Sequence, residues 1–107
     1  MTAEARAHIE RFNAAVRSGD WDEFVATLDP AAVMTFDGVP VGPFVGRETI
    51  AEAYATNPPT DTMAIHKIET EGGAEIVRFG WSRGGAGTLT IRRGPGGITE
   101  LAVSFEE

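Results

Sequence analysis

Cysteine is absent from the 107 residues, so disulfide bonds, thiolate metal sites and thiol nucleophiles are all excluded. This absence fits a cytoplasmic protein. Histidine is also scarce: His8 and His66 are the only two, and they lie too far apart for metal-ligand spacing. We therefore expect neither a metal nor a cofactor.

Basic residues are few as well. Nine lysines and arginines stand against 16 acidic residues, which gives a formal net charge of -7 and disfavours nucleic acid and anionic membranes as partners. No apolar run approaches the ~20 residues that a membrane-spanning helix needs. The N-terminal stretch "MTAEARAHIERF" also lacks the apolar segment of a signal peptide.

What the sequence does contain is enough apolar material for one core. Hydrophobic residues make up 42% of the chain, and 107 residues is a common length for one domain. We therefore predict a single domain spanning 1–107.

Three helices are expected in the first half of the chain. Ala5, Ile9, Phe12 and Val16 form one helical stripe, which places His8 on the polar, solvated side, and Gly19 suits the end of that helix. Asp20 then reads as an N-cap of a short second helix that ends at "LDP". After a strand "AVMTF" and a loop over 37–46, a third helix begins near residue 47, and "NPP" ends it.

The second half is strand-like. Four segments alternate apolar and polar residues and are separated by glycine-rich turns, which favours an antiparallel sheet covered on one side. The segments are "TMAIHKIET", "AEIVRFGWS", "GTLTIRR" and "ITELAVSF". This order predicts an α+β fold, a cone-shaped barrel in which a strongly bent, mainly antiparallel sheet wraps around about three N-terminal helices and encloses an apolar pocket.

The segments "RFNAAVRSGDWDEFVATL" and "GRETIAEAY" resemble the nuclear transport factor 2-like superfamily, which includes the SnoaL-like polyketide cyclases and the ketosteroid isomerases. The resemblance covers nearly the whole chain and implies the cone fold. It also implies a small apolar ligand of steroid or polyketide type, and pairing into a homodimer through the open sheet face, where Arg78, Ser82 and Thr90 lie.

The stretch "DGVPVGPFVGRETIAEAY" is similar to the ketosteroid isomerases, in which an aspartate at this position is a general base. By resemblance, Asp37 takes the role of catalytic base and Tyr54 supports an oxyanion-binding hydroxyl. The donor tyrosine of the family falls at Phe12, which has no hydrogen to donate, and its protonated aspartate falls at about Thr88. The resemblance thus implies a steroid-isomerase-like proton transfer with an incomplete oxyanion hole.

Several alternatives stay open at this point. Asp37-Gly38 is also an ordinary turn dipeptide, Tyr54 also fits a core position, and His66 fits either a pocket acid or base or a plain sheet residue. The remaining pocket candidates are wall residues, namely Phe12, Val16, Phe24, Phe36, Phe79 and Trp81. The function is then isomerase-like proton transfer, SnoaL-like polyketide cyclisation with Asp37 as acid and base, or noncatalytic ligand binding or dimerisation.

Overall fold

The computed structural model describes residues 2–106 and contains the three predicted helices. They are α1 (Thr2–Ser18), α2 (Asp22–Ala26) and α3 (Arg47–Thr56). The strands are β1 (Leu28–Asp37), β2 (Phe44–Val45), β3 (Met63–Glu71), β4 (Ala74–Trp81), β5 (Ala86–Gly94) and β6 (Gly97–Glu106). The two-residue strand β2 lies inside the segment that was expected to be a loop.

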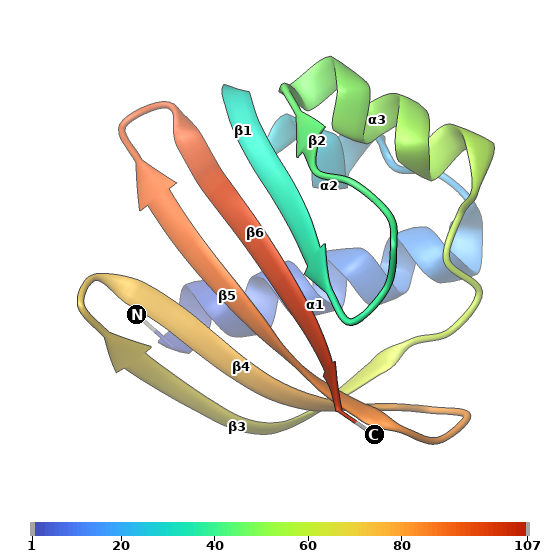
Figure 1. The fold of residues 1–107 in the computed structure, drawn as a ribbon, viewed down its shortest axis with the longest axis vertical. Helices are drawn as coiled ribbons and strands as arrows, with labels where there is room; N and C mark the ends of the chain where they lie inside the picture. Colours follow the sequence, from blue (N-terminus) through green and yellow to red (C-terminus); the bar gives the residue numbers. More distant parts are fainter. Residues whose placement is uncertain (1, 107) are drawn as a thin grey trace.

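The six strands form one sheet in the order β2-β1-β6-β5-β4-β3. All neighbours are antiparallel except β1 and β6, which run parallel. Figure 1 shows the sheet strongly curved, with α1 lying across one face and α3 beside β1 and β2. The predicted α+β architecture is confirmed, as a curved, cone-like sheet that does not close into a barrel.

The start of β1 differs from the prediction. The second helix ends at Ala26, and Leu28 and Pro30 already belong to the strand. Pro30 lies where the pairing of β1 with β6 changes register, between Leu28 and Val33. Proline has no N–H to give to a sheet ladder, and an irregular stretch of strand accommodates it.

The junction of α1 and α2 depends on Gly19 and Asp20. Gly19 has a φ of 80°, and its N–H donates to the Ala15 carbonyl at 2.7 Å, which closes α1. The Asp20 carboxylate accepts the N–H of Asp22 at 3.0 Å, whereas the residue directly before α2, Trp21, makes no side-chain cap. Asp20 therefore caps this turn as predicted, but α2 begins at Asp22, one residue later than an N-cap at Asp20 implied.

Helix α1 is fastened to the entry of β3 by one side chain. The Asn13 amide donates to the Met63 carbonyl at 2.9 Å and accepts the Met63 N–H at 2.8 Å. This pair fixes α1 along the concave face of the sheet, where its apolar side chains join those of β4, β5 and β6 in one core.

The opposite sheet face, called the outer face below, carries no helix in Figure 1. Strand alternation places small and polar side chains there, among them Thr35, Thr90 and Ser104, while Met34, Leu89 and Val103 point to the core. Within residues 2–106 no helix is both long and apolar enough to cross a membrane.

Candidate functional site

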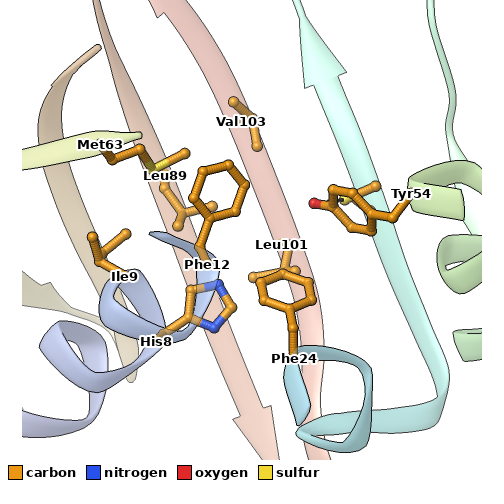
Figure 2. Close-up of a pocket in the computed structure, with 10 residues that line it drawn as sticks. His8, Ile9, Phe12, Phe24, Tyr54, Met63, Leu89, Leu101 and Val103 are labelled. Atoms are coloured by element: carbon orange, nitrogen blue, oxygen red, sulfur yellow. Dashed lines mark hydrogen bonds between the residues drawn. The ribbon is translucent and has the colours of Figure 1, made fainter. Parts of the chain in front are cut away.

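A small cavity lies at the centre of the core, between α1 and the sheet. Its volume is about 20 Å³, enough for one water-sized group. Figure 2 shows His8, Ile9 and Phe12 of α1 on one side and Tyr54 of α3 approaching from the other. The lining residues are His8, Ile9, Phe12, Phe24, Met34, Tyr54, Met63, Leu89, Leu101 and Val103.

A second, larger hollow opens to solvent between α3 and the β1–β2 edge of the sheet. This groove measures about 680 Å³, within the range of small-molecule sites. It is walled by Met34, Phe36, Val41, Phe44, Thr49, Glu52, Ala53, Tyr54, Thr56, Asn57 and Pro59. The walls are mainly apolar, and the Phe36 and Phe44 rings meet edge to face with centroids 6.1 Å apart.

Tyr54 and Met34 line both the cavity and the groove, so these two side chains form the wall between them. The Tyr54 hydroxyl donates to Met34 Sδ at 3.2 Å. The Tyr54 ring stacks on Trp21 with a centroid separation of 4.4 Å, which fixes its orientation. Burial raises the pKa of Tyr54 well above its usual range, so the hydroxyl remains protonated and able to donate.

His8 is the residue that the sequence placed wrongly. It is only 2% exposed, because the buried side of α1 includes His8 and Ala15 as well as Ala5, Ile9 and Phe12. Helix α1 lies inside the curve of the sheet and also packs against α2, so its buried face is wider than one stripe. The signal was present in the sequence, since His8 stands one turn from Phe12 and two turns from Ala15.

Burial also decides the charge of His8. It lowers the pKa of the imidazole to about 3, and the nearby charges of Arg93 and Arg11 act in the same direction. The ring is therefore neutral at pH 7. Its Nδ1 is buried and has no hydrogen-bond partner among the residues that the structure describes.

Asp37 does not lie with Tyr54. It is the last residue of β1, is exposed, and pairs in register with Ser104 of β6. Its neighbour Phe36 lines the groove, so strand alternation turns the Asp37 side chain to the outer face. Asp37 is absent from the walls of both the cavity and the groove.

His66 and Thr88, both expected at the pocket, also lie on the outer face. A β-bulge between Ile65 and Lys67 breaks the alternation, and His66 lies exposed over Gly80 instead of facing the core with Ile68. Thr88 stands between Arg78 and Ser104, and the residue after it, Leu89, lines the cavity.

The predicted wall residues are distributed unequally. Phe12 and Phe24 line the cavity, and Phe36 lines the groove. Phe79 and Trp81 belong to the aromatic core, with ring centroids 5.0 Å apart, and Val16 is half-buried against that core. Among residues 2–106, no group of histidine and acidic side chains is arranged to hold a metal ion.

An ionic cluster joins α1, β4 and β5. Arg93 Nε lies 2.8 Å from Glu75 Oε1 and 3.4 Å from Glu4 Oε2. Glu75 is 4% exposed, so this pair is largely shielded from solvent. The cluster ties β5 to β4 and α1 near His8.

The model of the SnoaL-like domain matches residues 9–103, nearly the whole chain. No curated protein sequence matches the chain. Many solved structures share its fold, including a nuclear transport factor 2-like protein from Cytophaga hutchinsonii. That protein is 18% identical with a TM-score of 0.72, and the alignment covers 94% of this chain and 88% of that one.

Two further structures extend the comparison. A nuclear transport factor 2-like protein from Anabaena variabilis aligns with a TM-score of 0.74 at 15% identity, over 96% of this chain and 87% of that one. TerC, co-crystallised with polyporic acid, aligns with a TM-score of 0.72 at 17% identity, over 94% and 89%. At such identities the likeness concerns the fold.

Proposed function

Because the chain belongs to the SnoaL-like domain family, within the nuclear transport factor 2-like superfamily, we propose that it binds a small, largely apolar molecule in the groove between α3 and the β1–β2 edge. The observation that carries the proposal is the groove itself, with its apolar walls, suitable volume and one buried hydroxyl at its inner end. TerC, a protein of the same fold, was crystallised with a small molecule, which supports this assignment.

Tyr54 supplies the polar contact in this proposal. Its hydroxyl donates to a thioether sulfur, which is a weak acceptor. A ligand oxygen offers a stronger acceptor at the same place, so exchanging the sulfur for oxygen favours binding. The stacked Trp21 ring keeps the hydroxyl in position before a ligand arrives, which lowers the ordering cost of binding.

Filling the groove tests this proposal. Replacing Ala53, whose side chain lines the groove, by tryptophan should weaken binding of the neutral dye N-phenylnaphthylamine at least about tenfold, because the indole occupies ligand space. Fluorescence titration measures the dissociation constant. Ala55→Trp is the matched control, since Ala55 is on the same helix, exposed, and outside the groove. Equal dye affinity in the two variants, or no dye binding to the unmodified protein, would contradict the proposal.

The exposed position of Asp37 supports binding over proton transfer by this carboxylate. A general base must come within hydrogen-bond reach of the proton that it removes, and Asp37 is on the sheet face opposite to the groove residue Phe36. We therefore propose that a molecule bound in the groove is not deprotonated by Asp37, whether it is steroid-like or polyketide-like.

An isomerisation assay tests the role of Asp37. The conversion of a steroid β,γ-unsaturated ketone to its conjugated isomer should proceed no faster with the protein than with Asp37→Asn, as followed by ultraviolet absorbance. A rate that falls about a hundredfold or more in Asp37→Asn would restore Asp37 as the base. Comparing the cyclisation rate of a polyketide substrate between the unmodified protein and Asp37→Asn tests the cyclase alternative in the same way.

Pairing of two copies through the outer face is retained as a prediction of the sequence. In Figure 1 that face carries no helix, and Arg78 and Thr90 lie on its strands, whereas Ser82 lies in the turn after β4. The molecular mass in solution tests it, because a dimer has twice the 11.4 kDa of the chain.

A further inference from the structure

We propose that the interior cavity is the polar end of the ligand site, where His8 and Tyr54 together bind one uncharged oxygen, a hydroxyl or a carbonyl, of the molecule seated in the groove. This inference rests on the proposed function and adds a second recognition residue and a ligand class. His8 acts here as a specificity-determining residue.

The composition of the cavity wall supports this inference. Only two of its ten lining side chains, His8 and Tyr54, carry a nitrogen or oxygen, and they come from two different helices. The Phe24 ring packs against both, with centroids 5.0 Å from His8 and 5.2 Å from Tyr54. A volume of about 20 Å³ suits a single oxygen-sized group between them.

The hydrogen bonding of the two residues leaves capacity for a ligand. His8 Nδ1 is buried without a partner among the described residues, which is unfavourable for a polar atom. Within residues 2–106 the Tyr54 hydroxyl has only the Met34 sulfur as acceptor. One hydroxyl can bond both groups, and a carbonyl oxygen can accept from both when Nδ1 carries the imidazole proton.

The route from groove to cavity passes between Tyr54 and Met34, which line both spaces. Methionine is unbranched and has three rotatable side-chain bonds, so Met34 can repack at low cost. A ligand that lies in the groove thus reaches the cavity by displacing one flexible side chain and breaking one weak hydrogen bond.

The charge state of the site favours a neutral ligand group. The His8 imidazole and the Tyr54 hydroxyl are both uncharged at pH 7, because burial lowers the pKa of the first to about 3 and raises that of the second. Arg93, a cation whose charge acts on His8, is already paired with Glu75 and Glu4. A carboxylate would lose its hydration in the cavity without gaining a counter-charge there.

Three probes with the same aromatic body test the inference by calorimetry: ethylnaphthalene, naphthylethanol and naphthylacetate. The protein should bind the alcohol at least about tenfold more tightly than either of the others. In His8→Phe the preference for the alcohol over the hydrocarbon should fall close to one, whereas His8→Asn, which keeps a polar atom at the δ position, should retain it. Tyr54→Phe should reduce the preference as well, and provides a second variant if His8→Phe does not fold.

The outcomes separate the two proposals. If the hydrocarbon and the alcohol bind equally well to the unmodified protein, or if His8→Phe keeps the full preference, the cavity inference fails and binding in the groove stands. Equal affinity for the carboxylate and the alcohol overturns the choice of an uncharged oxygen. If none of the probes binds, the proposed function fails, and the inference fails with it.

Discussion

Acidification from about pH 7 to about pH 4 is expected to lower the free energy of unfolding by about 3 kcal/mol through His8 alone. Burial, with the charges of Arg93 and Arg11, lowers the pKa of the folded-state imidazole from 6.5 to about 3. Between these values the unfolded chain binds a proton at His8 and the folded chain does not. The contribution of His8 to stability is therefore fully present above pH 6.5. It declines as the pH falls below this value, by about 1.4 kcal/mol per pH unit.

Urea unfolding at a series of pH values measures this loss. His8→Phe removes the group, so its stability should fall less than that of the unmodified protein over the same range. His66→Gln is the matched control, because it removes the other histidine of the chain, which is exposed, and should show the full loss. If the unmodified protein and His8→Phe lose the same free energy, His8 does not take up a proton on unfolding, and the lowered pKa of the folded state is wrong.

Gly97→Ala should destabilise the fold by about 3–4 kcal/mol, the largest effect that we expect from adding one methyl group. Gly97 begins β6 with a φ of 123°, a conformation that residues with a side chain rarely adopt. A Cβ there would also lie 2.6 Å from the carbonyl oxygen of Thr27 and 3.1 Å from the amide nitrogen of Asp29. Both contacts are with backbone, which cannot rotate away.

The clash would also displace the Thr27 carbonyl, which accepts the Ile98 N–H at 2.9 Å where β6 meets the start of β1. Gly73→Ala is the control. It has a similarly left-handed φ of 81° but no atom within 4 Å of the added carbon, so only the backbone strain of about 1 kcal/mol applies. Urea unfolding of both variants tests the argument, and equal losses would show that the contact at Gly97 relaxes freely.

The order and type of the elements could be read from the sequence because these signals are local. Gly19 and the "NPP" stretch end helices wherever they occur, and the alternation around Val77 and Phe79 makes a strand whatever lies opposite. The start of β1 could not be read in this way, since the strand tolerates Pro30 only through an irregular pairing with β6.

Among the candidate site residues, too, those with a local sequence signal could be placed from the sequence and the others could not. The inward position of Tyr54 could be predicted, because its helix presents a simple apolar stripe with Ile50. For Asp37 the alternation of the strand was informative, because Phe36 on the apolar face places the neighbouring Asp37 side chain on the other face. The resemblance to the ketosteroid isomerases instead predicted that Asp37 faces the pocket. The position of His66 depends on a β-bulge, which shifts the alternation without any local sequence signal.

By itself the sequence determined three helices and a mainly antiparallel sheet, since periodicity and chain-breaking residues act over a few positions, and its motifs identified the superfamily by resemblance. Only the tertiary structure decided which polar groups face the interior. His8 is buried because the curved sheet and α2 enclose more than one stripe of α1. Its place opposite Tyr54 follows from the packing of helices far apart in the chain, which local patterns do not encode.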